Sequence, residues 1–282
     1  MYGGKLMKDK FDLIQIHEHW KNWAITYGTD LRATTKTGTA KLIELAELKK
    51  TISSLKESLP INSRILEIGC GNGHNIFSLY EVFPNYRYQG IDFIEEMIMS
   101  AKQLRQSKLI DNESICFDVG NVLNLECPVE QYDLIFTVRC LINLNTDSLQ
   151  MKAIANIAEK IKSGGYFLML ENSIGSYSRQ NHLRTLVGLE EREPAEFNHF
   201  MNEKLVHDEL KSLGFVEIKN SCFSTLHDVV LYVLLPMING GKIDYENPMV
   251  EAAAKLSCAL TEDNYGMLGD YGQNRLYLYK KQ

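Results

Sequence analysis

A glycine-rich turn follows a short apolar run in residues 64–75, RILEIGCGNGHN. Gly69, Gly71 and Gly73 stand within five positions, directly behind the apolar residues. Between a strand and a helix, such a turn lets the backbone approach a ligand closely and directs the first amides of the helix at it. We therefore expect a strand, a tight turn and a helix here, with a ligand at the turn.

Segments with strand-like and helix-like patterns alternate around this turn. Alternation at this spacing predicts a parallel sheet with helices on both faces. The predicted strands are 63–69, 86–92, 114–122, 132–138 and 166–172, and the predicted helices are 74–84, 94–107 and 147–165.

The flanking segments predict a lid and two insertions. A helical stripe at 40–59 ends at Pro60, so we assign residues 1–60 to an N-terminal helical lid and 61–282 to the sheet domain. After the fifth strand we expect substrate-binding insertions at about 173–200 and 225–270. Residues 173–200 read as a polar segment. The remaining predicted elements are helix 202–214, strand 215–223, buried helix 228–238, helix 247–262 and a closing edge strand, 274–281.

Charge and hydropathy exclude several function classes. The formal net charge of the 282 residues is -6 and the basic residues are scattered, which predicts no nucleic-acid partner. No stretch reaches the roughly 18 to 20 apolar residues of a membrane span, and the first 20 residues lack a secretory apolar core. We expect a cytoplasmic protein with no membrane partner.

Two acidic residues near the glycine turn indicate which kind of ligand binds there. The dinucleotide pattern G-x-G-x-x-G would place its third glycine at His74, which argues against NAD or FAD. Glu67 ends the first strand, and Asp92 ends the next, where an acid can accept hydrogen bonds from both ribose hydroxyls. These acids predict a ligand with a ribose and a positive charge but no pyrophosphate.

The order E-x-G-x-G-x-G, then D-x-x-x-x-M, resembles class I methyltransferases that use S-adenosylmethionine. The resemblance covers residues 61–172 and extends to about 215. It implies an α/β, Rossmann-like fold with a mostly parallel seven-stranded sheet, and S-adenosylmethionine as the cofactor. It also implies a set of cofactor-binding residues: Gly69, Cys70, Gly71 and Gly73 at the methionyl part, Glu67 near the amino group, Asp92 at the ribose, Phe93 and Met97 beside the adenine, Asn121 and Val122 at the adenine edge, and Val138 and Arg139 at the sulfonium.

Residues 20–39, WKNWAITYGTDLRATTKTGT, are predicted to form a loop that grips a small polar ligand. The segment resembles the lid of small-molecule methyltransferases that act on sugars and other precursors of surface polysaccharides such as capsules. That likeness implies that Tyr27 and Arg32 close over the methionyl carboxylate. The alternative is that Trp20 and Trp23 are core anchors of an amphipathic helix.

The candidates for catalysis are His199, Glu171 and Arg139, with His227 as an alternative base. In an alternative role, Arg139 would form an anion-binding site together with Lys36 and Arg179 and bind an anionic group of the acceptor. No metal is expected, because histidines two positions apart in HEH at 17–19 point to different faces of a helix and no third ligand is near.

The sequence thus predicts methyl transfer to an oxygen or nitrogen of a small polar acceptor. The expected acceptor is a sugar- or nucleotide-linked precursor of a surface polysaccharide, with an anionic group. Two alternatives stay open: a methyltransferase that acts on protein or tRNA, and a non-catalytic module that binds S-adenosylmethionine.

Overall fold

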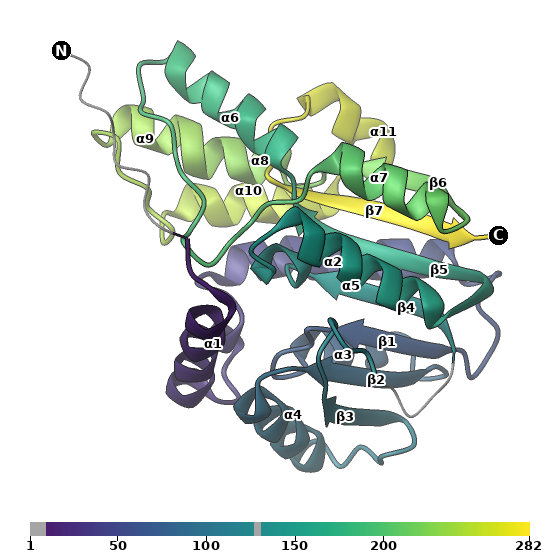
Figure 1. The fold of residues 1–282 in the computed structure, drawn as a ribbon. Helices are drawn as coiled ribbons and strands as arrows, with labels where there is room; N and C mark the ends of the chain where they lie inside the picture. The colour runs from purple at the N-terminus through teal and green to yellow at the C-terminus, as the bar shows by residue number, and fades with distance from the viewer. Residues whose placement is uncertain (1–9, 127–130) are drawn as a thin grey trace.

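The computed structural model describes residues 10–126 and 131–282 and is built around one seven-stranded sheet (Figure 1). The strand order is β3-β2-β1-β4-β5-β7-β6, in which β7 alone runs antiparallel to its neighbours. This confirms the mostly parallel seven-stranded sheet. The strands are β1 (Arg64–Ile68), β2 (Arg87–Asp92), β3 (Ile115–Val119), β4 (Tyr132–Val138), β5 (Ile161–Asn172), β6 (Phe215–Ser221) and β7 (Asn274–Lys281).

Strand β7 is not the edge strand that its alternating sequence predicts. It is paired on both sides, between β5 and β6, and β6 forms the edge. The residues that read as polar are tyrosines whose rings are buried and whose hydroxyls find partners: Tyr277 lies 3.3 Å from Glu203 Oε1 and Tyr279 lies 3.0 Å from Glu217 Oε2. A tyrosine with a paired hydroxyl can fill an interior position.

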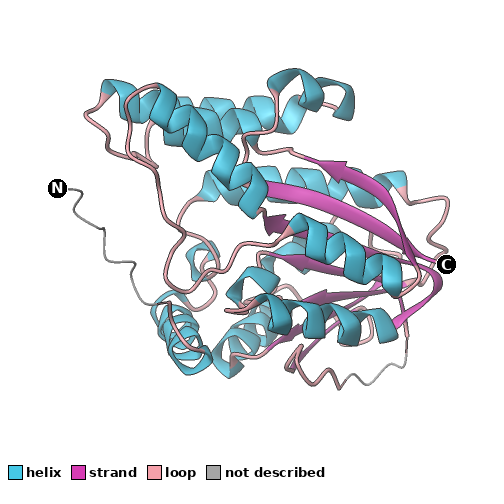
Figure 2. Cartoon of the chain, turned by 45° about the horizontal axis from the view of Figure 1, so that its top comes forward, coloured by secondary structure: helices cyan, strands magenta, loops and turns pink. Residues whose placement is uncertain are grey.

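Helices cover both faces of the sheet (Figure 2). One hydrophobic core contains residues of α2 (Gly38–Ser54), α3 (His74–Tyr80), α4 (Glu95–Ser107) and α10 (Pro248–Ala259). The core on the other face contains residues of α5 (Asp147–Glu159) and α7 (Glu203–Ser212).

The lid is smaller than the predicted residues 1–60. Leu48 and Ile52 of α2 are fully buried against the sheet, so α2 belongs to the core layer. The covering part of the described chain is α1 (Leu13–Tyr27), a short 3-10 turn (Leu31–Ala33) and the residues that lead into α2.

The structure corrects the predictions for two segments in the middle of the chain. Helix α5 ends at Glu159, and β5 already begins at Ile161, before the glycine pair that we expected to stop the helix. The segment 173–200 is not only a polar segment, because α6 (Ile174–Leu186) occupies its first half. That helix buries Tyr177 and Arg184, two residues that an apolar pattern does not reveal.

The apolar run at 228–238 lies in a helix with a π-helical turn. Helix α8 (Thr225–Val229) continues through the π turn (Val230–Leu234) into α9 (Leu235–Ile238). Pro236 has no N–H to donate to the carbonyl of Tyr232 one turn earlier, and the guanidinium of Arg184 donates to that carbonyl instead. Helix α11 (Glu262–Tyr265) precedes β7. None of the helices described here has the length and hydropathy that a membrane span requires.

Candidate functional site

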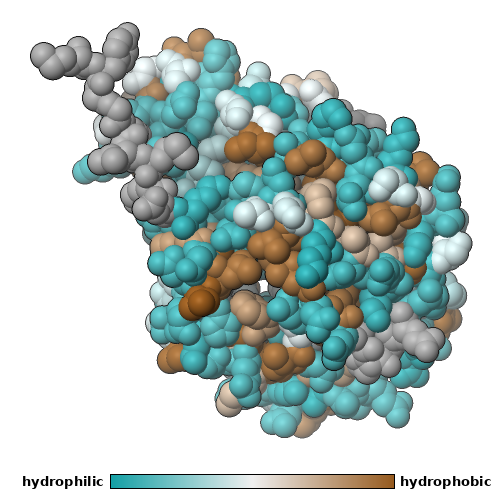
Figure 3. Space-filling model, viewed as in Figure 1, coloured by the Kyte–Doolittle hydropathy of each residue, from teal (hydrophilic) through white to brown (hydrophobic). Residues whose placement is uncertain are grey.

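A cavity of about 660 Å³ lies beyond the carboxyl ends of the parallel strands. Ligands of open α/β sheets bind at this edge, and the volume is that of a small-molecule site. In Figure 3, apolar side chains border a hollow on the face that carries α1. The walls come from α1, the glycine turn, the ends of β2, β4 and β5, residues 192–200 and the π-helical segment.

The glycine turn forms one end of the cavity. Gly69 and Gly71 line it with φ angles of 71° and 53°, a region that favours glycine. Gly73 does not line the cavity as expected. A side chain there would stand 2.7 Å from Cζ of Phe117, so Gly73 allows helix α3 to pack against strand β3.

Asp92 joins the end of β2 to the glycine turn. Its Oδ2 accepts the N–H of Gly71 at 2.8 Å, and its Oδ1 accepts the N–H of Ile94 at 2.9 Å. Burial raises the pKa of this carboxyl above its ordinary value. Each oxygen has a second lone pair, so Asp92 can still accept hydrogen bonds from a ribose.

All four residues that are expected at the adenine lie at one end of the cavity. Phe93, Met97, Asn121 and Val122 line the cavity there. The side chain of Asn121 is used locally, however, because its Oδ1 accepts the N–H of Leu123 at 2.9 Å.

Glu67 lies beneath the cavity lining rather than in it. It is fully buried, its Oε1 accepts a hydrogen bond from Asn75 Nδ2 at 2.6 Å, and burial raises its pKa to about 8. The other side of the Asn75 amide accepts from Lys41 Nζ at 3.2 Å. Asn75 and Lys41 both line the cavity, so Glu67 positions the site through them and does not border the space for a cofactor amino group.

The lid residues differ from their predicted roles. Trp20, Trp23 and Tyr27 lie on helix α1 rather than in a loop. Trp20 and Trp23 are partly buried and line the cavity, so they are not the core anchors of the alternative. Arg32 and Tyr27 are outside the cavity lining: the guanidinium donates to both carboxylate oxygens of Asp30 at 2.9 Å and lies 5.2 Å from the centre of the Tyr27 ring. Neither can close over a ligand in this arrangement.

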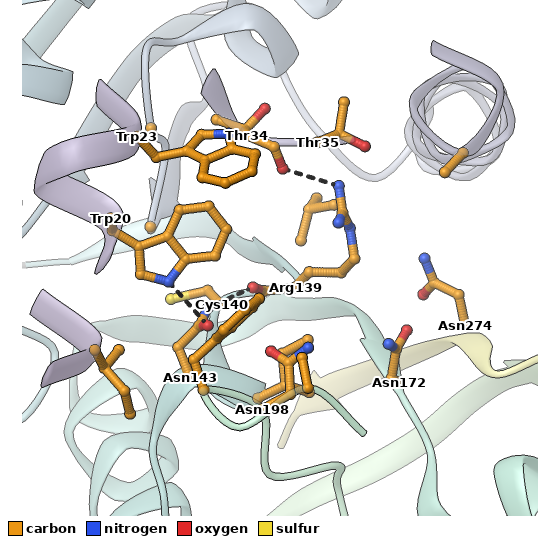
Figure 4. A pocket seen from close by; sticks show the side chains of 18 of the residues that line it. Trp20, Trp23, Thr34, Thr35, Arg139, Cys140, Asn143, Asn172, Asn198 and Asn274 are labelled. Atoms are coloured by element: carbon orange, nitrogen blue, oxygen red, sulfur yellow. Dashed lines mark hydrogen bonds between the residues drawn. The ribbon is translucent and has the colours of Figure 1, made fainter. Parts of the chain in front are cut away.

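The indoles of α1 form one wall of the cavity (Figure 4). Trp20 Nε1 donates to Asn143 Oδ1 at 3.1 Å, and Trp23 Nε1 donates to the carbonyl of Arg32 at 2.6 Å. The first bond ties α1 to the turn that follows β4, and the second ties it to the 3-10 turn that follows α1.

His199 is not placed to act as a base. Its Nδ1 lies 2.7 Å from Lys10 Nζ and its Nε2 lies 2.7 Å from Asp147 Oδ1, so both nitrogens have partners. The side chain does not line the cavity. His199 instead connects the residues before α1 with the start of α5.

Glu171 is also excluded as the base. It is fully buried outside the cavity lining, and its carboxylate accepts the backbone N–H groups of Cys140, Leu141 and Ile142 at 3.0, 3.1 and 3.4 Å. Burial raises its pKa to about 7. Glu171 therefore fixes the turn that follows β4.

Arg139 lines the cavity but does not form the predicted anion site. Its Nε lies 2.7 Å from Glu44 Oε1, and its Nη2 donates to the carbonyl of Thr34 at 3.2 Å. Arg179 is paired with Asp270 and lies outside the cavity lining. Lys36 does line the cavity, but the three cations are not assembled around one space.

A histidine and an aspartate lie together in the cavity wall. His227 Nδ1 is 2.8 Å from Asp228 Oδ1, and His227 Nε2 is 3.1 Å from Thr39 Oγ1. Asp228 Oδ2 accepts bonds from the Ser224 hydroxyl and the Gln273 N–H, both at 2.8 Å. His227 was a sequence candidate; Asp228 was missed because it stands at the start of an apolar run.

The residues present fit S-adenosylmethionine. A glycine turn at which a ligand can meet the backbone, an acid with free lone pairs at the end of β2 and a half-exposed aromatic residue beside it are the groups that its methionyl, ribose and adenine parts need. Among the described residues no three His, Cys, Asp or Glu side chains form a group that could hold a metal ion.

Fold and site together define a class I, Rossmann-like methyltransferase, a class whose cofactor is S-adenosylmethionine. The model of the methyltransferase domain family matches residues 61–217, and the chain belongs to this family.

Known relatives are similar to this chain over part of its length. A protein of Talaromyces variabilis named S-adenosyl-L-methionine-dependent Diels-Alderase iccD is 31% identical over 115 residues, which are 40% of this chain and 38% of that protein. The yeast protein-lysine N-methyltransferase EFM4 is 24% identical over 38% of this chain and 50% of its own length. The matches therefore span half or less of the length of these relatives.

Solved structures share the fold over almost the whole chain. The N-methyltransferase NodS from Bradyrhizobium japonicum, in complex with S-adenosylhomocysteine, has a TM-score of 0.55 at 14% identity and covers 94% of this chain and 98% of its own. A methyltransferase from Clostridium acetobutylicum has a TM-score of 0.54 at 14% identity, with 93% and 99% covered.

Proposed function

We propose that this protein transfers a methyl group from S-adenosylmethionine to an oxygen or nitrogen of a small polar molecule. One observation carries the proposal: a single cavity extends from Asp92 to Asn274 and is covered by α1 and residues 192–200. A cavity of about 660 Å³ has room for a cofactor and a compact acceptor. A protein or tRNA chain would have to insert one residue past this cover.

S-adenosylmethionine supplies an electrophilic methyl group, so the protein has to position the acceptor and take up its proton. Gly69, Gly71 and Asp92 hold the cofactor. The acceptor occupies the part of the cavity beyond Arg139, which is lined by Asn172 and His227.

His227 is the base of this proposal. Asp228 accepts the proton of Nδ1, which leaves Nε2 unprotonated and able to accept. The hydroxyl of Thr39 lies at Nε2 and is 3.2 Å from the hydroxyl of Thr37, which lines the cavity. A proton from the acceptor can reach Nε2 of His227 through these two hydroxyls.

The names of the relatives do not indicate one class of methyl acceptor. Their names include a Diels-Alderase, a protein-lysine methyltransferase and a tRNA (carboxymethyluridine(34)-5-O)-methyltransferase of Arabidopsis thaliana. None of these supports the surface-polysaccharide precursor expected from the lid, so the proposal is restricted to a small polar acceptor.

The test supplies methyl-tritiated S-adenosylmethionine and three fractions from the organism that encodes the chain: protein-free metabolites, total tRNA and total protein. The proposal predicts label in the metabolites alone. Label in tRNA or protein would assign a macromolecular substrate. Binding of S-adenosylhomocysteine without label in any fraction would favour the non-catalytic module.

A further inference from the structure

Two asparagines stand opposite each other at the inner end of the cavity. Asn172 ends β5, Asn274 begins β7, and the two are direct partners in the antiparallel pairing of these strands. Directly opposed residues point to the same side of a sheet with Cβ atoms about 5 Å apart. Figure 4 shows both side chains on the side of the cavity away from Trp20 and Trp23.

Both amides present an unused acceptor. Asn172 is 5% exposed and Asn274 is 6% exposed, both line the cavity, and neither side-chain oxygen has a hydrogen-bond partner among the described residues. A buried carbonyl without a partner costs free energy, which a ligand that donates to it removes.

The orientation of the Asn274 amide is fixed by its neighbour. Its Nδ2 donates to Glu44 Oε1 at 2.9 Å. If the amide were rotated, its oxygen would face a carboxylate, and both groups only accept. Asn274 Oδ1 therefore offers an acceptor to the cavity.

Of the two arginines that line the cavity, Arg139 has a carboxylate partner, whereas the partners of Arg192 are uncharged. Arg139 is paired with Glu44. Arg192 donates to Gln180 Oε1 at 2.7 Å and to Gln273 Oε1 at 3.4 Å, and its guanidinium lies 3.5 Å from the centre of the Tyr232 ring. Tyr177, whose hydroxyl has no hydrogen-bond partner among the described residues, and Asp228 also line the cavity.

We infer that Asn172 and Asn274 form a subsite for a neutral or cationic group with two hydrogen-bond donors, such as an amino group or neighbouring hydroxyls. The part of the acceptor that lies at this end then carries an amino group or a pair of neighbouring hydroxyls. This inference rests on the proposed function and specifies the substrate class of the same site.

The test uses the metabolite fraction with methyl-tritiated S-adenosylmethionine, followed by treatment of the labelled product with periodate, which cleaves neighbouring hydroxyls, and with an amine-reactive reagent. The inference predicts a labelled product that reacts with at least one of the two reagents. A product that reacts with neither overturns the subsite and leaves the proposed function standing. The absence of label from all metabolites overturns the proposed function, and the subsite with it.

Variants locate the effect at the asparagines. Asn172→Leu removes the acceptor at nearly constant volume and should lower label transfer about tenfold or more, with S-adenosylhomocysteine affinity unchanged. Asn172→Asp keeps acceptor oxygens and should retain transfer. Asn22→Ala, exposed on α1, is the matched control and should behave as wild type. Unchanged transfer by Asn172→Leu overturns the inference; if that variant does not fold, the reactions of the wild-type product with periodate and the amine reagent decide.

Discussion

Glu44 and Arg139 connect helix α2 with the end of strand β4, with Glu44 Oε1 2.7 Å from Arg139 Nε. The Glu44 side chain is 1% exposed and also lies 3.5 Å from Lys41 Nζ. Arg139 has a positive φ of 49°, unusual for a residue other than glycine, and donates to the Thr34 carbonyl beside the glycine turn. This ion pair thus connects the cofactor end of the cavity with Asn274, which donates to the same carboxylate.

Replacement of Arg139 by Ala should destabilise the fold, because it leaves a buried carboxylate with Lys41 as its remaining cation. We expect the free energy of unfolding, measured with urea, to fall by about 3 kcal/mol. Lys204→Ala, which removes an exposed pair with Asp208, is the control and should change it little. An equal fall in the free energy of unfolding for both variants would mean that the ion pair of Arg139 with Glu44 stabilises the fold no more than an exposed pair does.

Gly71→Ala should mainly lose ligand affinity, whereas Gly73→Ala should mainly lose stability. A methyl group at Gly71 meets the end of the Thr34 side chain at the cavity, so S-adenosylhomocysteine binding should weaken about tenfold or more with modest loss of stability. A methyl group at Gly73 meets the Phe117 ring in the core, so the free energy of unfolding should fall by about 2 kcal/mol or more. Calorimetry and urea unfolding of both variants separate the effects; a reversed pattern would contradict the assignment of Gly71 to the cavity.

Glu67→Gln should change how stability depends on pH. The folded-state pKa of Glu67 is raised to about 8 from an ordinary value of 4.5, so between these values the folded protein holds a proton that the unfolded chain has lost. The wild type therefore loses stability as pH rises through this window, and Gln, which resembles the protonated acid, removes that loss. Urea unfolding at pH 5, 6.5 and 8 should show the variant gaining relative to wild type. A difference in the free energy of unfolding between variant and wild type that does not change with pH would contradict the raised pKa of Glu67.

His227→Gln and His199→Gln provide a test of the base. Loss of His227 should lower kcat about 100-fold with S-adenosylhomocysteine affinity nearly unchanged. Loss of His199 should leave kcat near wild type, because His199 lies outside the cavity lining. The rate of label transfer to metabolites measures kcat of both variants. A larger loss in His199→Gln than in His227→Gln would support His199 as the base, as the sequence predicts.

The sequence predicts the elements of the cofactor half because their signals are local. The glycine turn and Asp92 are only 19 residues apart, and each follows a strand whose apolar residues identify it. Even there, periodicity does not reveal that Gly73 faces Phe117 or that Glu67 lies beneath the lining. Those facts depend on which side of a tight turn each residue occupies.

The acceptor half is assembled from distant residues, and His227 is the member of it that the sequence predicts. Asn172 and Asn274 meet only because β7 inserts between β5 and β6, and strand order is not encoded in hydrophobic alternation. His199 looked available because its partner Lys10 is 189 residues away. Arg32 looked like a ligand-binding cation because no pattern shows that Asp30 binds it.

The most direct test of the central claim is calorimetric titration of the protein with S-adenosylhomocysteine, with NAD as comparison and Asp92→Ala as the variant. The account predicts binding of S-adenosylhomocysteine and not NAD, and a loss of about 1 to 3 kcal/mol in the variant, because the ribose hydroxyls lose their acceptor. Binding of NAD, or an unchanged affinity in Asp92→Ala, would contradict it.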